Sequence, residues 1–341
     1  MKILVTGAAG FIGFHTCLKL LKQGHDVYGI DNINDYYDPQ LKYDRLNELG
    51  IKKNKACIFK LNVKSSKYEM FKFSRLDLID REGIDSLFKK EQFTIVCNLA
   101  AQAGVRYSID NPHAYIDSNI NGFLNILEGC RRNKVNHLVY ASSSSVYGEN
   151  EKVPFDILDK VDHPISLYAA TKKSNELMAH TYGHLYGFKT TGLRFFTVYG
   201  PWGRPDMAYY LFADAISNNQ PIKVFNNGKM ERDFTFIDDI VICLVKIIEK
   251  NIDSRFHYKI YNIGNNKTES LNDFITTIEH AIGKKAIKEM LPMQAGDVPK
   301  TFANIDELIK DYKYKPKMDI NYGLKIFVDW YKKYNQLSSL K

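Results

Sequence analysis

The sequence predicts a doubly wound parallel α/β sheet followed by a smaller, mixed α/β domain. Residues 2–6 form a short apolar stretch that leads directly into a glycine-rich turn and a helix. Further apolar strands then alternate with helical stretches as far as residue 195. Such alternation is typical of parallel sheets covered by helices on both faces. Beyond residue 195 the pattern becomes less regular, which indicates the second domain.

Length and composition restrict the classes of protein to consider. The chain has 341 residues, 45% of them hydrophobic, so it can bury a large core in one large or two smaller domains. No apolar stretch is long enough to span a bilayer, and the first strand leaves no room for a signal peptide. The five cysteines are scattered and odd in number, which argues against a disulfide framework or a zinc site. We therefore predict a cytoplasmic protein with no membrane span and no metal.

The formal net charge of +8 favours an anionic partner. The lysines are spread along residues 52–72 and 310–341, as on solvated helix faces, rather than gathered into one stripe. An anionic small substrate therefore explains the charge better than nucleic acid does.

The turn after the first strand has the spacing of a dinucleotide-binding loop. Gly7 suits a tight turn, Gly10 lets backbone N–H groups approach a pyrophosphate, and Gly13 allows close packing of helix and strand. The helix that follows presents its unpaired N–H groups and positive dipole end to the phosphates. We predict that this loop, including Phe11 and Ile12, binds the cofactor in a Rossmann-type domain.

Asp31 indicates which dinucleotide is bound. It ends the second strand, eighteen residues past Gly13, where a carboxylate accepts hydrogen bonds from the ribose and repels a 2′-phosphate. Asn32 follows, with no arginine beside it to favour NADP. The cofactor prediction is therefore NAD. Two alternatives remain: a glycine-rich turn without a ligand, and an aspartate that only caps a turn.

Three more cofactor residues are predicted from their places at strand ends. Asp77 and Leu78 follow the third strand, where an acidic residue commonly reaches the adenine ring. Ala100 ends the fourth strand and keeps the side chain small where a cofactor passes close to the backbone. The expected strands are 69–76, 93–100 and 136–141, and the expected helices are 80–90, 112–132 and 168–186.

Four serines, residues 142–145, follow the fifth strand, at the edge of the sheet where such folds place their chemistry. Tyr168 and Lys172 share one face of the next helix because they are four residues apart. A tyrosine titrates near ~10, and a neighbouring ammonium and an oxidised nicotinamide both favour its phenolate. We predict Tyr168 as the base, Lys172 as its cation and Ser143 as a second hydrogen-bonding group. The tyrosine–lysine spacing also occurs by chance, and serine clusters also form turns or helix caps.

The division into domains follows from where the regular pattern ends. The predicted NAD-binding Rossmann-type domain comprises residues 1–189, with 236–264 returning to it. Residues 190–235 and 265–341 then form a smaller, mixed domain that binds the substrate. We expect strands at 190–195, 222–225 and 258–263, and helices at 208–217, 240–250 and 322–334.

These motifs together make the chain similar to the extended short-chain dehydrogenase/reductases, in the group of NAD-dependent epimerases and dehydratases of nucleotide sugars. The resemblance covers nearly the whole chain and depends on the glycine loop, Ser143, the Tyr168–Lys172 pair and an Arg-Asp-Phe stretch at Arg232. Four closer stretches resemble UDP-glucuronate 4-epimerases: residues 31–38, 100–106, 196–207 and 296–299.

The resemblance implies a reaction and its contacts. Tyr168 removes the proton of the C4 hydroxyl while a hydride passes to NAD, the 4-keto sugar turns over, and the hydride returns to its other face. NAD is regenerated in each cycle, and the products are polysaccharide precursors. The implied substrate-binding residues are Arg106, Ser143, Ser144, Ser145, Thr197, Arg204, Arg232 and Asp297.

Ser144 and Ser145 favour one reaction within the group. The related 4,6-dehydratases carry Asp-Glu at these positions, and UDP-glucuronate decarboxylases carry a glutamate at the position of Ser145. The resemblance therefore implies interconversion of UDP-glucuronate and UDP-galacturonate. A 4-epimerase of a neutral or N-acetylated UDP-hexose and a non-catalytic NAD-bound sensor remain as alternatives. The resemblance also implies a homodimer, in which the helices predicted at 112–132 and 168–186 form a four-helix bundle.

Overall fold

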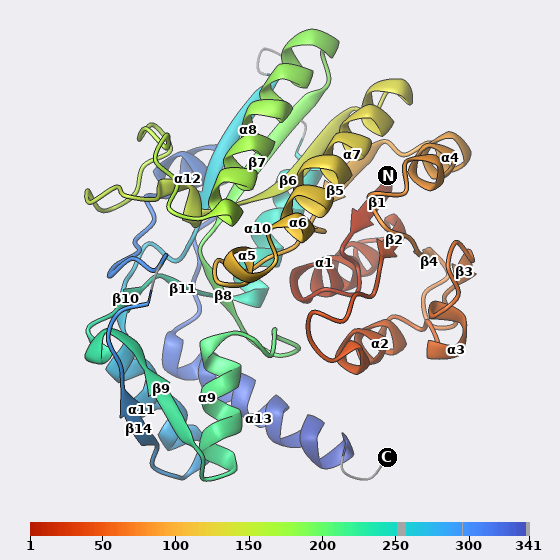
Figure 1. Cartoon of the computed structure of the whole chain (residues 1–341). Helices are drawn as coiled ribbons and strands as arrows, with labels where there is room; N and C mark the ends of the chain where they lie inside the picture. The colour runs from red at the N-terminus through yellow and green to blue at the C-terminus, as the bar shows by residue number, and fades with distance from the viewer. Residues whose placement is uncertain (251–256, 295, 339–341) are drawn as a thin grey trace. The chain divides into compact units, whose positions relative to one another are not determined.

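The computed structural model describes residues 1–250, 257–294 and 296–338 (Figure 1). The chain separates into two compact units, and it passes between them several times. The boundary lies inside one helix and one strand, so neither unit is a single continuous segment. Unit 1 comprises Met1–Asn150, Ile157–Phe195 and Val241–Tyr261, and unit 2 comprises Glu151–Asp156, Phe196–Ile240 and Asn262–Lys341.

An eight-stranded sheet forms the centre of unit 1, in the order β12-β7-β6-β5-β1-β2-β4-β3. From β7 to β4 each neighbouring pair is parallel, whereas β3 is antiparallel to β4. The parallel strands are apolar along most of their length because helices cover both faces. The strands are β1 (Lys2–Thr6), β2 (Asp26–Asp31), β3 (Val63–Lys64), β4 (Phe71–Arg75), β5 (Ile95–Asn98), β6 (His137–Ser143), β7 (Lys189–Phe195) and β12 (Tyr258–Ile263).

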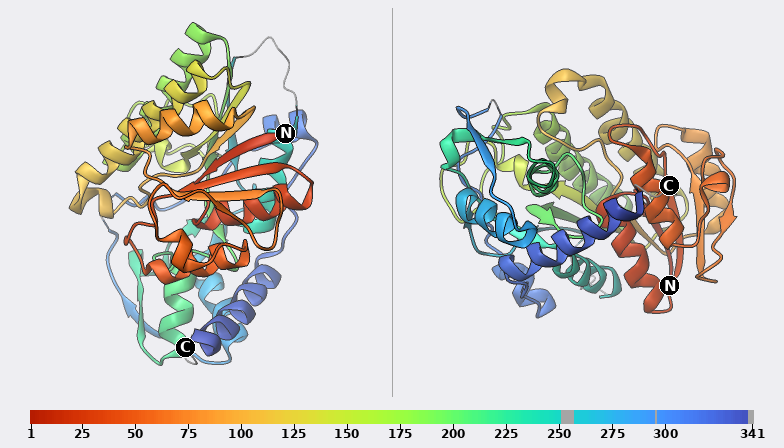
Figure 2. Two further views of the ribbon diagram at one scale, coloured as in Figure 1. Left: turned by 90° about the vertical axis from the view of Figure 1, so that its right-hand side faces the viewer. Right: turned by 90° about the horizontal axis from the view of Figure 1, so that it is seen from below.

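Helices cover both faces of this sheet (Figures 1 and 2). On one face α4, α7 and α8 pack against a core that includes Leu4, Val96 and Leu138, and α1 and α10 lie on the other face. The helices of unit 1 are α1 (Phe11–Lys22), α2 (Pro39–Glu48), α3 (Lys53–Ala56), α4 (Arg81–Glu91), α5 (Tyr107–Asp110), α6 (Pro112–Tyr115), α7 (Gly122–Arg132) and α8 (Leu167–Tyr186), with most of α10 (Ile237–Glu249). The predicted doubly wound sheet is confirmed.

The helix predicted at residues 112–132 is interrupted. Its middle is a π-helical turn, η1 (Ile116–Asn121), which separates α6 from α7. This turn carries the buried Asn119, whose side chain bonds to backbone outside the helix. Just after the turn, a side chain on Gly122 would begin 2.7 Å from the Leu78 Cβ. The apolar periodicity alone gave no sign of this interruption.

Unit 2 is built from three two-stranded sheets and several helices. Strands β11 and β8 pair in parallel, as do β14 and β9, whereas β10 and β13 are antiparallel. The core is aromatic, and the rings of Phe234 and Phe274 stack with centroids 4.2 Å apart. Its elements are β8 (Thr197–Tyr199), α9 (Ala208–Ser217), β9 (Pro221–Val224), η3 (Phe225–Gly228), β10 (Glu231–Arg232), β11 (Phe234–Phe236), β13 (Glu269–Ser270), α11 (Leu271–Ile282), β14 (Ile287–Met290), α12 (Asp306–Tyr312) and α13 (Ile320–Ser338).

The predicted domain boundaries need correction. Residues 190–195 belong to unit 1, because β7 pairs with β6 along its whole length from Lys189 to Phe195. Residues 151–156, 236–240 and 262–264, which were expected in the first domain, belong to unit 2. Residue 236 belongs to unit 2 because the strand at 234–236 pairs with the strand at 197–199.

Two predicted absences concern the membrane and disulfides. Among the residues described, no helix has the length and apolar character needed to cross a bilayer. The five cysteines all lie in the described part of the chain, and no disulfide joins them there. Four of them are buried and Cys57 is exposed.

Candidate active site

The glycine-rich turn lies between β1 and α1. Gly7 has φ +71°, and the N–H of Gly10 donates to the Gly7 carbonyl at 2.9 Å. A side chain on Gly13 would begin 2.0 Å from that carbonyl oxygen, so the position accepts no larger residue. Phe11 and Ile12 open α1, whose first turn has no acidic residue and no side-chain cap. The N–H groups and positive dipole end of this helix therefore suit an anion.

Asp31 ends β2 and is buried beside this turn. Its carboxylate accepts hydrogen bonds from the N–H groups of Ala9 at 3.1 Å and Ile33 at 2.8 Å. The turn-capping alternative thus describes part of what Asp31 does. Each carboxylate oxygen accepts more than one hydrogen bond, so these two contacts leave Asp31 able to bind a ribose as well. That contact with a ribose remains a prediction.

Sequence reasoning missed two buried cations on α2. Arg45 is fully buried, and its Nη1 donates to the Ala9 carbonyl at 2.9 Å and to the Tyr37 hydroxyl at 2.8 Å. Lys42 is also buried, and its Nζ donates to the Asn34 carbonyl at 2.9 Å. They bring positive charge close to the loops that follow β1 and β2. Their spacing of three residues on a short helix was the available signal.

The other predicted cofactor residues also lie at the carboxyl ends of strands in unit 1. Asn32 donates to Asp77 at 2.9 Å and so joins the ends of β2 and β4. The N–H of Ala100 donates to the Thr6 hydroxyl at 3.0 Å, which joins the ends of β5 and β1. Leu78 is buried in the core against α7. Ligands in open α/β sheets bind at this edge.

Ser143 is the last residue of β6 and caps the short 3-10 helix η2 (Ser144–Tyr147). Its Oγ accepts a hydrogen bond from the Ser145 N–H and donates to the Ser145 Oγ, both at 3.1 Å. Ser144 and Ser145 are both partly exposed. The alternative that the serines cap a helix is therefore correct for Ser143. The two contacts with Ser145 also orient the Ser143 hydroxyl.

Tyr168 and Lys172 lie in the first turns of α8, which Ser166 caps. Lys172 is 3% exposed, and its Nζ donates to the Ala141 carbonyl of β6 at 2.9 Å. Burial lowers the pKa of the Lys172 ammonium to about 8, so this group still carries its charge at neutral pH. Tyr168 is half-buried, and its ring lies edge-on to Tyr115 with centroids 6.0 Å apart.

A buried ion pair holds α8 to β7, and a hydrogen bond to the same carboxylate joins the end of β6 to α8. Glu176 accepts from the Ser142 hydroxyl at 2.7 Å and pairs with Nε and Nη2 of Arg194 at 2.8 and 2.9 Å. Ser142 directly precedes Ser143, and Glu176 lies one helical turn after Lys172. The strand end with the serines and the helix with the lysine are therefore held together. Sequence reasoning missed this pair because its members are distant in the chain.

Asn119 of η1 makes a further set of contacts that was not predicted. Its side chain accepts from the Gln102 N–H at 2.8 Å and donates to the Gln102 carbonyl at 3.0 Å and the Thr171 hydroxyl at 3.1 Å. Asn175 donates to the Asn119 carbonyl at 2.6 Å. One buried amide thus ties the loop after β5 to the helix that carries Tyr168.

Three predicted UDP-sugar residues lie near one another in unit 2. Thr197 begins β8, and its N–H donates to the Asp233 carbonyl at 3.2 Å. Arg232, the residue before Asp233, donates from Nη1 to the Pro299 carbonyl at 3.1 Å. Asp297 lies two residues before Pro299 and is partly exposed.

Asp233 holds these segments in place. It is fully buried, and its carboxylate accepts from the N–H groups of Asn265 at 2.6 Å, Asn266 at 3.1 Å and Ala303 at 3.2 Å. Burial raises the pKa of the Asp233 carboxyl to about 6, against the effect of these N–H groups, which favour the charged form. Three segments distant in sequence thus meet beside Arg232.

Arg204 lies in the loop between β8 and α9 of unit 2. Its Nε and Nη2 donate to the two carboxylate oxygens of Asp206 at 3.0 and 2.5 Å, and its N–H donates to the Tyr209 hydroxyl at 3.0 Å. This two-point geometry is the one with which an arginine binds carboxylates in general. Arg106 is exposed at the start of α5 in unit 1.

The sequence model of the NAD dependent epimerase/dehydratase family matches residues 3–264. The chain belongs to this family. Protein CapI of Staphylococcus aureus is 52% identical over 98% of this chain and 99% of its own length. The probable UDP-glucuronate 4-epimerase of Rhizobium meliloti (strain 1021) is 44% identical over 97% of both chains. The crystal structure of UDP-glucuronic acid 4-epimerase from Bacillus cereus in complex with UDP-glucuronic acid and NAD has a TM-score of 0.87 and 32% identity, and covers 98% of this chain and 100% of that one.

The predicted membership of the epimerase/dehydratase family is therefore confirmed, together with the fold class. The matched range, residues 3–264, includes almost all of unit 1 and also residues 196–240 of unit 2. Beyond residue 264 the similarity continues, because the relatives align over almost the whole chain.

Proposed function

We propose that this protein is an NAD-dependent UDP-glucuronate 4-epimerase, an isomerase that interconverts UDP-glucuronate and UDP-galacturonate. The observation that carries this proposal is the near full-length similarity to the probable Rhizobium meliloti UDP-glucuronate 4-epimerase. The Bacillus cereus enzyme, crystallised with UDP-glucuronic acid and NAD, supports the same substrate and cofactor. We place the reaction in the cytoplasm, as a supply of polysaccharide precursors.

The residues of unit 1 fit NAD. The glycine turn leaves no room for a Cβ at Gly13, and the first turn of α1 has no acidic side chain to repel a pyrophosphate. Asp31 would accept the ribose hydroxyls, with Asn32, Asp77, Leu78 and Ala100 along the adjoining strand ends. When bound, NAD supplies the reversible hydride acceptor that inversion at C4 requires.

Tyr168 carries the proton chemistry. It removes the proton of the C4 hydroxyl in the first half of the reaction and returns it in the second. Because the hydride is also returned to C4, the reaction has no net redox change. The buried ammonium of Lys172 favours the phenolate by its charge, and Ser143 donates a hydrogen bond to the reacting oxygen. The contacts of Glu176 and Asn119 keep α8 and β6 in place for this chemistry.

Unit 2 would bind most of the UDP-sugar. Thr197, Arg232 and Asp297 lie close together there, and Asp233 fixes the segments that carry them. Arg204 would hold the C6 carboxylate in the two-point manner that it now uses for Asp206. From unit 1, Arg106, Ser144 and Ser145 would add hydrogen bonds.

A product assay tests the function directly. Purified protein is incubated with UDP-glucuronate, UDP-glucose and UDP-N-acetylglucosamine in separate reactions, and the products are separated. We expect UDP-galacturonate from the first and little conversion of the other two, with only trace NAD needed. Better conversion of a neutral sugar would replace this proposal with the neutral-hexose alternative. Accumulating NADH would indicate a dehydrogenase, and no conversion of any sugar would favour the sensor.

Arg204→Ala should reduce kcat/KM for UDP-glucuronate by a factor of roughly ten to a hundred and fifty. A hydrogen bond to a charged group contributes about 1.5–3 kcal/mol, and this arginine would make such bonds to the carboxylate. Any weak activity on UDP-glucose should be spared. Because the 4-keto intermediate is a β-keto acid, a loosened carboxylate should also leave as CO2, and UDP-pentose should be detected.

Arg81→Ala is the matched control for Arg204→Ala, since Arg81 is an exposed arginine at the start of α4. It should leave both substrates unaffected. If Arg204→Ala lowers the activity on UDP-glucose as much as that on UDP-glucuronate, Arg204 does not recognise the carboxylate.

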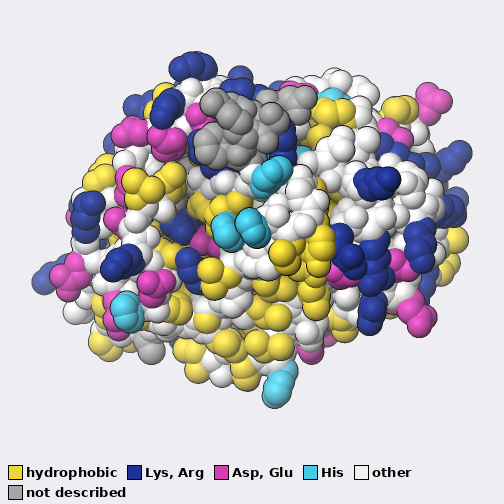
Figure 3. All heavy atoms as spheres, turned by 90° about the horizontal axis from the view of Figure 1, so that it is seen from above, with side chains coloured by type: hydrophobic (Ala, Val, Ile, Leu, Met, Phe, Trp, Pro, Cys, Tyr) yellow, Lys and Arg dark blue, Asp and Glu magenta, His cyan; other side chains and the backbone are white. Residues whose placement is uncertain are grey.

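We also propose that the protein is a homodimer joined through α7 and α8. Both helices present apolar side chains outward: Leu124 is 40% exposed, Leu177 is 58% exposed and Leu185 is 61% exposed. Hydrophobic side chains gather along the lower edge of Figure 3. This edge is the side nearest the viewer in Figure 1, where α7 and α8 lie. Leu127, by contrast, is fully buried and belongs to the core.

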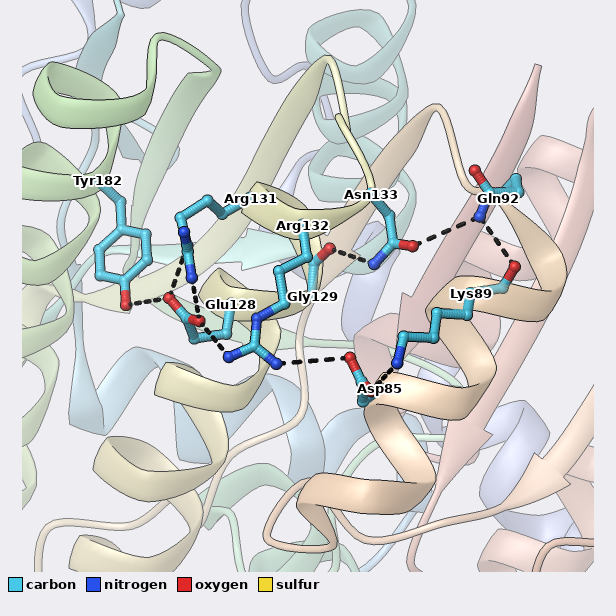
Figure 4. A network of polar contacts seen from close by, with 9 residues as sticks. All are labelled: Asp85, Lys89, Gln92, Glu128, Gly129, Arg131, Arg132, Asn133 and Tyr182. Atoms are coloured by element: carbon cyan, nitrogen blue, oxygen red, sulfur yellow. Dashed lines mark hydrogen bonds and ion pairs between the residues drawn. The ribbon is translucent and has the colours of Figure 1, made fainter.

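Polar contacts fix the spacing of the helices in this face (Figure 4). Glu128 of α7 accepts from the Tyr182 hydroxyl of α8 at 2.8 Å and pairs with Arg131 and Arg132 at 2.8 and 2.9 Å. The hydrogen bond and charge of Arg131 lower the pKa of the Glu128 carboxyl to about 2. Arg132 also reaches Asp85 of α4 at 3.7 Å. A fixed spacing gives a partner subunit a defined surface.

Leu177→Glu combined with Leu185→Glu should convert the dimer to a monomer, because it places two carboxylates in an apolar contact. Sedimentation velocity at micromolar concentration measures the change. Leu158→Glu is the control, since Leu158 is 89% exposed and lies outside these helices. A wild-type monomer, or a double variant that sediments as the wild-type dimer, would contradict this interface.

A further inference from the structure

The segment between α2 and β4 carries a basic and apolar surface that the proposed reaction does not use. We refer to the exposed side chains of residues 52–64 as the 52–64 surface. It includes α3 and β3, the last strand at one edge of the unit 1 sheet, drawn in orange in Figure 1. It contains no acidic residue, and its five lysines are Lys52, Lys53, Lys55, Lys60 and Lys64.

Three large apolar side chains of this surface face solvent. Ile58 is 50% exposed, Phe59 is 55% exposed and Leu61 is 38% exposed. Consecutive Cα atoms are about 3.8 Å apart, so the three residues lie within roughly 11 Å of one another. Their backbone is anchored, because the Lys60 N–H donates to the Arg75 carbonyl at 2.9 Å and the Arg75 guanidinium lies 4.2 Å from the Phe59 ring centre.

Lysines lie on both sides of this apolar group along the chain. Lys55 lies one turn before Ile58, whose N–H donates to the Lys55 carbonyl at 3.2 Å. Lys60 pairs with Asp80 at 2.7 Å. Lys52, Lys55 and Lys64 are exposed, and within the described part of the chain no carboxylate lies at ion-pair distance from them. The surface therefore combines unneutralised positive charge with exposed aliphatic and aromatic side chains.

We propose that the 52–64 surface binds an anionic lipid membrane. Lysines attract acidic headgroups and apolar side chains enter the interface, and this combination characterises proteins that lie on a membrane without crossing it. Protein partners fit less well, because the cores of protein–protein interfaces are depleted of lysine, and this surface has five lysines among thirteen residues. Lysines also protect exposed sheet edges, which explains Lys64 on β3 but not the exposed Ile58 and Phe59.

Flotation with lipid vesicles tests this proposal. The full-length protein is mixed with vesicles of phosphatidylcholine alone or with about one-third phosphatidylglycerol, at about 0.1 M and 0.5 M NaCl. We expect binding to the anionic vesicles at low salt, weaker binding at high salt and none to phosphatidylcholine. Removing three lysines should weaken binding about a hundredfold, since each contributes roughly five-fold near an anionic surface.

Two variants separate charge from insertion. The first replaces Lys52, Lys55 and Lys64 with Gln, and the second replaces Ile58, Phe59 and Leu61 with Ser. Both should lose vesicle binding and keep epimerase activity. The matched control replaces three exposed lysines of unit 2 with Gln and should still bind: Lys315, Lys325 and Lys333.

Three results would overturn the proposal. The first is a wild-type protein that does not bind anionic vesicles, and the second is binding that survives in both variants. The third is vesicle binding that survives in the Ser variant while single-stranded RNA binds equally to the wild type and to the Ser variant, which would make the surface a general polyanion site. None of these depends on which sugar the enzyme uses, so the product assay and the vesicle assay fail independently.

Discussion

Tyr168→Phe should lower kcat by about 10²- to 10⁴-fold, the range that a positioned acid–base group contributes. The substitution removes one hydroxyl and keeps the ring that lies edge-on to Tyr115. NAD should therefore stay bound, and unfolding by urea should change little. Steady-state conversion of UDP-glucuronate and the NAD content of the purified variant measure the two effects separately.

The same helix supplies a matched control for this variant. Tyr182 also lies on α8, but its hydroxyl donates to Glu128 of α7 at 2.8 Å and has no role in the proposed proton transfer. Tyr182→Phe should keep turnover close to wild type. If Tyr168→Phe is as active as Tyr182→Phe, another group must remove the C4 hydroxyl proton and the proposed mechanism is wrong.

Gly13→Ala should abolish the retention of NAD and destabilise unit 1. The new Cβ would begin 2.0 Å from the Gly7 carbonyl oxygen, which is a backbone atom, and no side-chain rotation moves a Cβ away. Overpacking of this kind lowers the free energy of unfolding by roughly 1–3 kcal/mol. Here it would also displace the turn that would bind the pyrophosphate. The NAD content after denaturation and the midpoint of urea unfolding measure the two effects.

Gly24→Ala separates the loss of cofactor from general destabilisation. Gly24 has φ +80°, yet a side chain there would meet nothing within 4 Å. This variant should lose some stability through backbone strain and still retain NAD. Wild-type NAD retention in Gly13→Ala would exclude the glycine turn as the cofactor site.

Much of the sheet was predictable because short-range rules determine it. The glycine turn after β1, the apolar runs of β5 and β6 and the start of α8 all depend on neighbouring residues. The positions of Asp31, Ser143 and Lys172 at strand ends or on a helix face follow from the same patterns. Their roles in binding and catalysis remain predictions.

Contacts between distant segments were not predictable in this way. Arg45 is fully buried and donates to the carbonyl of Ala9, which lies thirty-six positions earlier in the chain. The two-residue strand β3 is too short for a periodic pattern, and Asn119 interrupts a helix whose apolar spacing is regular. Asp233 was visible as part of a motif, but its three backbone partners lie beyond residue 260.

The repeated passage of the chain between the two units has a consequence for how the protein is made. The sheet of unit 1 is complete only when β12 joins β7, and β12 begins at Tyr258. During synthesis the ribosome therefore releases residues 196–240 of unit 2 before the sheet of the first unit can be completed. A fragment ending at Phe195 would lack β12 and α10, leaving β7 as an open edge and one face of the sheet partly bare. Neither unit is one uninterrupted segment of the chain, so no single cut in the sequence would separate unit 1 from unit 2.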